Sequence, residues 1–132
     1  NMFKPDRDVK QDHMQSSRFI SSQIDVITLY RSQDCNLALM NQNIGDMIET
    51  GKPQLVVGDF NFCYLESSSN FTSKYLHFNN FKQLITEPTH LEGNLIDQAH
   101  FRDIEGDLQC QVRLHIKYYT DHKGVAIIVK KS

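Results

Sequence analysis

The sequence has few cysteines, no long apolar run and no large excess of charge of either sign. Its three cysteines, Cys35, Cys63 and Cys110, lie far apart and form no CxxC pair, which argues against a zinc site or a disulfide framework. Such sparse cysteine usage favours a reducing compartment, so we expect an intracellular location, nuclear or cytoplasmic. No apolar segment approaches the length of a membrane span, and the first residues show no signal-peptide pattern.

The charge balance and the length set broad bounds. A formal net charge of −2 gives the chain no global basic character that would attract nucleic acid, although a local basic patch is compatible with it. Hydrophobic residues at 39% and charged residues at 23% are typical of a globular protein and not of a disordered one. The 132 residues suffice for one domain or a part of one, and the opening Asn1 suggests a processed or partial sequence.

Alternating strand and helix patterns predict a layered α/β (α+β) fold. Residues 1–16 are polar, lack periodicity and are expected to be irregular. Further along, apolar residues at three- and four-residue spacing predict helices, and β-branched or alternating runs predict strands. The expected helices cover 34–50 and 71–84, the second as one helix or as two pieces around Asn79–Asn80, and the expected strands cover 17–22, 23–31, 55–57, 95–101, 108–119 and 125–129.

The most informative stretch is 55–61, in which the apolar residues 55–57 are followed by a glycine, an acid and an amide. The apolar run predicts a strand buried on both faces, and ligands of open α/β sheets lie outside the carboxyl ends of such strands. Gly58 allows a turn or a close approach of the backbone, and Asp59 and Asn61 point to the same side if the extended conformation continues. The stretch therefore predicts a site for a polar substrate, with a simple strand-to-turn transition as the alternative.

The strand expected over 23–31 ends in Tyr30 and Arg31. A phenol can donate a hydrogen bond, and a guanidinium can bind a phosphate through two donors. Both residues are therefore candidates for contacts with a substrate phosphate. A packed ring and a surface cation are the alternatives.

Polar residues also interrupt the chain where strands begin or end: Asp59 with Asn61, then Asp97, then Asp121 with His122. A carboxylate and a histidine from separate strands can converge at one sheet edge, where the carboxylate fixes the tautomer of the imidazole. Further acids in such a cluster can position a metal or a water molecule. We therefore expect these residues to form a catalytic cluster.

Three segments resemble motifs of the endonuclease/exonuclease/phosphatase superfamily, which includes apurinic endonucleases, retrotransposon endonuclease domains, DNase I-like nucleases, sphingomyelinases and inositol-phosphate phosphatases. They are Val57-Gly58-Asp59-Phe60-Asn61, Gly93-Asn94-Leu95-Ile96-Asp97 and Tyr119-Thr120-Asp121-His122, in the order and approximate spacing of the last three family motifs. They look most like the motifs of retrotransposon-type and apurinic endonucleases. The resemblance implies a DNase I-like four-layer sandwich of two mixed β-sheets flanked by helices, incomplete at the N-terminus, with residues 1–132 as a single partial domain.

The resemblance also implies Mg²⁺- or Mn²⁺-dependent phosphodiester hydrolysis, with DNA as the expected partner. Asp59 would activate or orient the attacking water, and Asn61 would help to hold the scissile phosphate. His122 would contact the phosphate and stabilise developing charge, and Asp97 would orient His122. These roles suit attack on an anionic phosphate, which needs a positioned water and charge neutralisation.

Two further roles follow from the resemblance: Asp121 would lie beside the metal, and Tyr30 would contact a phosphate oxygen. The chain also departs from the family pattern. The first motifs, which supply an asparagine and the glutamate that is the principal Mg²⁺ ligand, cannot be assigned in it, Thr120 stands in place of the usual serine, and Gln98 replaces a frequent His or Tyr. Two alternatives therefore stay open: a truncated, catalytically inactive fragment with a binding role at most, and a phosphatase acting on lipid or inositol phosphates.

Overall fold

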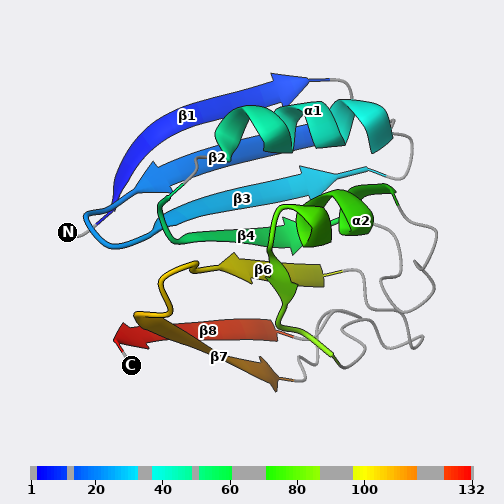
Figure 1. Ribbon diagram of the computed structural model, residues 1–132. Helices are drawn as coiled ribbons and strands as arrows, with labels where there is room; N and C mark the ends of the chain where they lie inside the picture. The colour runs from blue at the N-terminus through cyan, green and yellow to red at the C-terminus, as the bar shows by residue number, and fades with distance from the viewer. Residues whose placement is uncertain are drawn as a thin grey trace.

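A six-stranded mixed sheet forms the centre of the fold, with two helices on one face and a two-stranded sheet packed against the other (Figure 1). The computed structural model describes residues 3–11, 14–32, 37–48, 51–60, 71–86, 97–115 and 124–131. Neither helix in these ranges is long and apolar enough to cross a membrane. The strands are β1 (Lys4–Gln11), β2 (Met14–Ile20), β3 (Asp25–Arg31), β4 (Gln54–Asp59), β5 (Lys82–Gln83), β6 (Asp97–Arg102), β7 (Leu108–His115) and β8 (Gly124–Lys131), and the helices are α1 (Leu37–Met47) and α2 (Phe71–Phe78).

The large sheet has the strand order β1-β2-β3-β4-β6-β5. β3 and β4 run parallel, with α1 between them in the sequence, whereas the other neighbouring strands pair antiparallel. β4 lies inside the sheet, and its residues Leu55 and Val56 are buried in the cores on its two faces. This confirms the expected doubly buried strand. The carboxyl ends of β3 and β4 therefore meet at one edge, which is where the sequence motifs predict a site.

The first strand lies where the chain was expected to be irregular. β1 is the edge of the large sheet and pairs antiparallel with β2, from Lys4↔Ile20 to Gln11↔Met14. The prediction for 1–16 was therefore wrong for the described part of that segment. Charged side chains and proline protect an edge strand from pairing with other chains, so β1 carries these in place of the apolar alternation that would have revealed it.

α1 and α2 cover one face of the large sheet and share an apolar core with it (Figure 1). Ile27 and Val56 of the sheet, Met40 and Ile44 of α1, and Leu76 of α2 are almost fully buried in this core. The three- and four-residue spacing of apolar residues that predicted the first helix gives α1 the face that packs here. The helix is confirmed, and it covers the middle of the expected range.

α2 ends at Phe78, although a helical pattern was expected to reach residue 84. The Phe81 N–H donates to the Leu76 carbonyl at 2.9 Å, and the Asn80 N–H donates to the His77 carbonyl at 3.0 Å, which is the Schellman pattern of a helix end. Asn80 has a φ of 68°, a left-handed conformation that asparagine tolerates. The expected break near Asn80 is confirmed, but the piece that follows is the strand β5 rather than a second helix.

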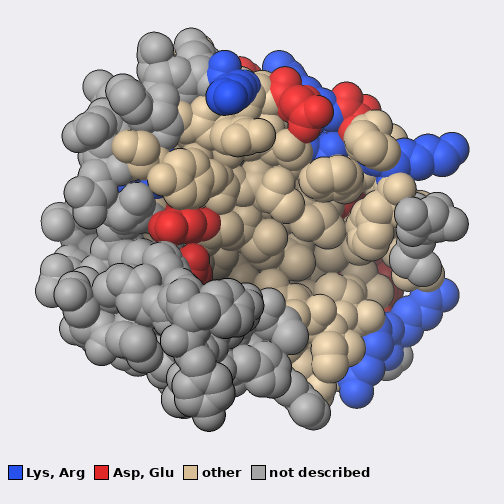
Figure 2. Space-filling view, turned by 180° about the vertical axis from the view of Figure 1, so that it is seen from behind, with Lys and Arg blue, Asp and Glu red and all other residues tan. Residues whose placement is uncertain are grey.

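Among the described residues, β7 and β8 cover part of the opposite face of the large sheet. Leu108, Ile127 and Val129 of β7 and β8 pack against the core that contains Leu55 and Ala99. Seen from this side, the molecule presents a broad, hollowed surface of uncharged side chains (Figure 2).

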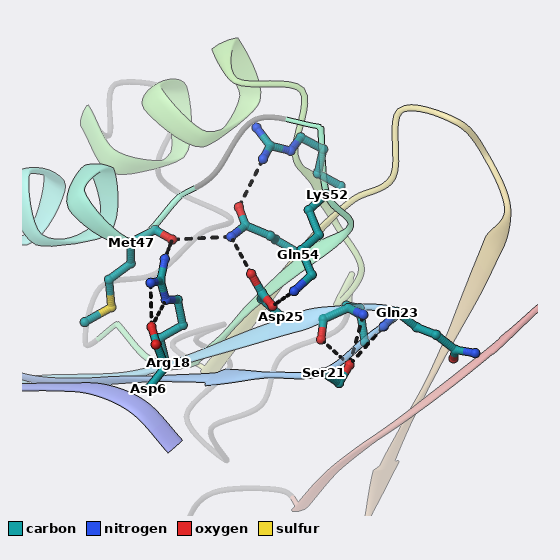
Figure 3. A network of polar contacts seen from close by, with 10 residues as sticks. Asp6, Arg18, Ser21, Gln23, Asp25, Met47, Lys52 and Gln54 are labelled. Carbon is teal, nitrogen blue, oxygen red and sulfur yellow. Dashed lines mark hydrogen bonds and ion pairs between the residues drawn. The ribbon is translucent and has the colours of Figure 1, made fainter. Parts of the chain in front are cut away.

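A polar network closes the end of the sheet where β3 and β4 begin (Figure 3). The fully buried Asp25 carboxylate accepts hydrogen bonds from Lys52 Nζ and from Gln54 Nε2. Gln54 also donates to the Met47 carbonyl at 3.3 Å and accepts from Arg102 Nη2 at 3.0 Å. Because buried charge is tolerated only with paired and hydrogen-bonded partners, these contacts are what allow Asp25 to lie inside the protein.

Candidate active site

Three of the predicted site residues lie side by side at one edge of the large sheet. Tyr30 pairs with Asp59 in the parallel β3–β4 register, and Asp59 pairs with Asp97 in the antiparallel β4–β6 register. Residues directly opposite each other on neighbouring strands project to the same face, with Cβ atoms about 5 Å apart. The strand order therefore brings these residues from distant parts of the sequence into one row at the carboxyl ends of β3 and β4.

The row Tyr30–Asp59–Asp97 is open to solvent. Tyr30 is 51% exposed, and both aspartates are partly exposed. Acidic side chains border the hollowed face at the edge where β4 ends (Figure 2). The antiparallel pairing of β4 with β6 thus places two carboxylates opposite each other at this edge.

Arg31 points away from this row. Consecutive residues of a strand project to opposite faces, and Arg31 is 8% exposed, on the side of the helices. Its Nη1 donates to the Phe60 carbonyl at 3.2 Å. The described guanidinium contact is therefore to the backbone next to Asp59. A phosphate contact by Arg31 stays a prediction, and the alternation of side chains along a strand was the sequence signal that separates it from Tyr30.

The backbone around Asp59 is held from both sides. Gly58 has a φ of 152°, and a Cβ atom there would lie 1.7 Å from the Leu29 carbonyl oxygen, so the close approach of β3 and β4 at this point requires glycine. Phe60 is fully buried in the core beneath the helices. Asp59 thus stands at the surface between two residues that the fold fixes.

His100 supports Phe60 from the neighbouring strand β6. The two ring centroids lie 5.5 Å apart, and His100 Nε2 lies 2.9 Å from Gln98 Oε1. Burial lowers the pKa of His100 to about 3, so the imidazole is neutral at neutral pH. His100 was not among the predicted site residues. The sequence signal for its position is the alternation of a strand: His100 projects to the face opposite that of Ala99 and Phe101, which is the helix-covered face of this buried strand.

The remaining predicted site residues, Asn61, Asp121 and His122, lie outside the described residues, so their roles stay predictions. Within the described ranges, no group of three or more metal-binding side chains is found. The carboxylates of Asp59 and Asp97 supply oxygen ligands of the kind that Mg²⁺ and Mn²⁺ prefer. The chemistry of the described donors therefore fits the predicted cation.

Cys110 of β7 is free and half-buried. Burial, together with the negative charge of Asp103, raises the pKa of its thiol to about 11. Because the thiolate is the reactive form, Cys110 is not suited to act as a nucleophile at neutral pH.

No protein-family model matches the sequence, and no similar sequence is found among curated proteins. Solved structures do match. An endonuclease/exonuclease/phosphatase family protein from Leptotrichia buccalis has a TM-score of 0.61 at 10% identity, over 89% of this chain and 53% of its own. CdtB, the biologically active subunit of cytolethal distending toxin, has a TM-score of 0.63 at 12% identity, over 95% and 55% of the two chains. The cytolethal distending toxin of Haemophilus ducreyi gives 0.58 at 17% identity, over 97% and 57%.

Identities this low show a shared fold. The chain spans a little over half the length of the solved structures that it matches. The helix, mixed-sheet and second-sheet layers agree with these structures, so the fold that the sequence motifs implied is confirmed. This chain therefore has the DNase I-like fold of the endonuclease/exonuclease/phosphatase proteins.

Proposed function

We propose that this chain supplies part of a metal-dependent phosphodiesterase site that cleaves DNA. The observation that carries the proposal is the row of Tyr30, Asp59 and Asp97 at the open ends of three adjacent strands. The fold shared with an endonuclease/exonuclease/phosphatase family protein and with CdtB supports it. The proposal concerns the part of such a domain that this chain contains.

In this proposal each side chain has a separate role in the attack of water on phosphorus. Asp59 orients the attacking water and accepts its proton, while the phenol of Tyr30 donates a hydrogen bond to a phosphate oxygen. Asp97 holds His122 in the orientation and tautomer that let it stabilise charge on the phosphate. Asn61 helps to hold the scissile phosphate.

The cofactor of this proposal is Mg²⁺ or Mn²⁺. Asp121 is the proposed ligand, and the carboxylates of the row add negative charge and oxygen donors near it. The bound cation would neutralise charge on the phosphate during hydrolysis. The residues of the chain would do the rest: they position the water, the phosphate and the proton.

Plasmid nicking tests the proposal. We expect a complete domain that contains this chain to convert supercoiled plasmid into open circles with Mg²⁺ and not with EDTA. Asp59→Ala and His122→Ala should lower the rate by roughly 100-fold or more, because each removes a group that acts on water or phosphate. Asp97→Asn should lower it less, since the amide still fills the position. Asp46→Ala, on the exposed side of α1, is the control and should nick at the normal rate.

Each outcome bears on the assignment. A normal rate for Asp59→Ala would contradict the proposal, and a normal rate for Asp97→Asn would contradict the pairing with His122. Phosphate release from inositol phosphates, measured beside nicking, tests the phosphatase alternative, which the family name of the Leptotrichia buccalis protein keeps open. Binding of DNA without hydrolysis of either substrate would instead favour a binding role.

A further inference from the structure

Arg31 is the last residue of β3 and carries a buried positive charge next to the proposed site. Its guanidinium Nη1 donates to the Phe60 carbonyl at 3.2 Å, inside the protein. A hydrogen bond from a charged donor is stronger than one between neutral groups, and burial reduces its screening. The contact therefore restrains the carbonyl of Phe60, the residue that follows Asp59.

The position of this contact in the ladder gives it a particular effect. The described register between β3 and β4 ends at the pair Tyr30↔Asp59. Phe60 is the first residue after the end of β4. The Arg31 side chain therefore continues the link between the two strands one residue beyond their backbone pairing.

Phe60 transmits this restraint to Asp59. Its ring is fully buried and packs on His100, so the residue is held by its side chain from below and by its carbonyl from β3. On the other side of Asp59, Gly58 lies so close to the Leu29 carbonyl that no side chain fits. Asp59 has little freedom to move while both neighbours are fixed.

We infer that Arg31 is a positioning residue for the Asp59 carboxylate. The inference rests on the proposed hydrolysis for its effect on rate, whereas the placement of Asp59 can be tested without any activity. It gives Arg31 a role through the backbone of Phe60 and requires no contact with substrate. A displacement of a reacting group by about 1 Å is enough to lower a rate by roughly 100-fold, so a contact of this kind is measurable.

Arg102 provides a matched control within the same sheet. It is also almost fully buried, at 4% exposed, and it also bonds protein acceptors, the Gln54 side chain at 3.0 Å and the Asn79 carbonyl at 3.5 Å. Gln54 is the first residue of β4 and Asp59 the last, so Arg102 lies at the end of the strand remote from the proposed site. Both guanidiniums are buried and hydrogen-bonded to protein acceptors, but only that of Arg31 borders Asp59.

The kinetic test compares Arg31→Met, Arg31→Lys and Arg102→Met in plasmid nicking and in thermal unfolding. We expect Arg31→Met to lower kcat roughly 10- to 100-fold with KM changed less than about twofold. Arg31→Lys keeps a charged donor and should recover part of kcat. Arg102→Met should lower the melting temperature at least as much as Arg31→Met and leave kcat unchanged. A rise in KM at normal kcat would mean a direct phosphate contact, and equal kcat losses at both arginines would mean general destabilisation; either result overturns the inference.

An NMR measurement separates this inference from the proposed function. The carboxyl carbon resonance of Asp59 and its pH titration are followed in the unaltered chain, Arg31→Met and Arg102→Met. We expect both to change in Arg31→Met and neither in Arg102→Met, whether or not the chain hydrolyses DNA. An unchanged Asp59 signal in a folded Arg31→Met variant overturns the inference. The expected NMR changes combined with an inactive complete domain would remove the proposed function and leave the inference standing.

Discussion

His100 shows what burial does to one titratable residue beneath the proposed site. Its ring lies 2% exposed on β6, against Phe60, and Nε2 approaches Gln98 Oε1. In the unfolded chain an imidazole has a pKa of about 6.5, whereas in the folded protein burial lowers the pKa of His100 to about 3. Between these two values the unfolded state binds a proton that the folded state does not. The stability contributed by the neutral ring is therefore present above about pH 6.5 and is lost as the pH falls toward 3.

We predict that His100→Gln makes unfolding less sensitive to acid. Glutamine can still donate to Gln98 but does not titrate. For the unaltered chain, the His100 contribution to the free energy of unfolding should fall by at most about 2 kcal/mol between pH 7 and pH 5, and in His100→Gln that contribution should vanish. Urea unfolding at the two pH values measures the difference.

His77→Gln is the control for this prediction. His77 is exposed on α2, so its replacement should leave the pH dependence of unfolding unchanged. The prediction fails if the unaltered chain and His100→Gln lose the same free energy of unfolding over this range.

Residue identity alone could not separate Tyr30 from Arg31. Both side chains can bind phosphate, and both end the same strand. The structure exposes the phenol beside Asp59 and buries the guanidinium beside Phe60. The alternation of a strand predicts that the two residues separate, but which face is buried depends on the helices, and so on tertiary packing.

At the scale of elements, α1 and α2 approach closely through a glycine. A Cβ atom at Gly45 of α1 would lie 2.8 Å from the Tyr75 hydroxyl oxygen of α2. Alanine is favoured over glycine inside a helix by about 1 kcal/mol, but here that gain competes with the need to displace the hydroxyl.

We predict coupling between these two positions. Gly45→Ala alone should leave the free energy of unfolding unchanged or lower, whereas in a Tyr75→Phe background the same change should raise it by about 1 kcal/mol. Chemical unfolding of the four chains of this double-mutant cycle measures the coupling energy. Gln42→Ala, at an exposed position of α1, is the control and should show no coupling to Tyr75→Phe. Additive effects at Gly45 and Tyr75 would mean that the helices do not meet through this contact.

The elements that the sequence predicted are those whose hydrophobic period reports their surroundings. β3, β4 and α1 carry strong apolar patterns because one or both of their faces are buried, and all three are confirmed. β1 has no such pattern because it is a charged edge strand. The spacing of apolar residues also continues past the end of α2. Phe81 and Ile85 are buried, but they follow the turn at Asn80 and do not belong to the helix. The spacing of apolar residues indicates which positions are buried, and a turn can end a helix without interrupting that spacing.

The arrangement of the site residues depends on the order of the strands in the sheet, which the spacing of apolar residues does not predict. The motifs implied that Asp59 and Asp97 come together, but their direct opposition follows from β6 pairing antiparallel with β4. The opposition of Tyr30 and Asp59 follows likewise from the parallel register of β3 with β4. Both depend on contacts between segments far apart in the chain, so the sequence predicted that these residues cluster but not which of them pair.

At the scale of the whole molecule, the two ends of β4 differ in the burial and hydrogen bonding of their charged residues. At its carboxyl end, Asp59 and Asp97 lie opposite each other and are partly exposed. At its amino end, Asp25 is fully buried and bonded by Lys52 and Gln54 (Figure 3). Stability and activity should therefore respond to changes at opposite ends of the same strand.

This separation predicts the behaviour of Lys52→Met. The substitution leaves the buried Asp25 carboxylate without its cation, which should lower the free energy of unfolding by about 2–3 kcal/mol; the value lies below that for fully buried pairs because the Lys52 side chain is 30% exposed. Adding Asp25→Asn removes the uncompensated charge and should restore most of that loss. Urea unfolding measures the loss and its recovery, while plasmid nicking by the folded variants should stay normal. Asp59→Ala is the converse: it should abolish nicking and keep the free energy of unfolding. A loss of nicking in the folded double variant would mean that the two ends of β4 are coupled. It would contradict the prediction that stability and activity respond to changes at opposite ends of the strand.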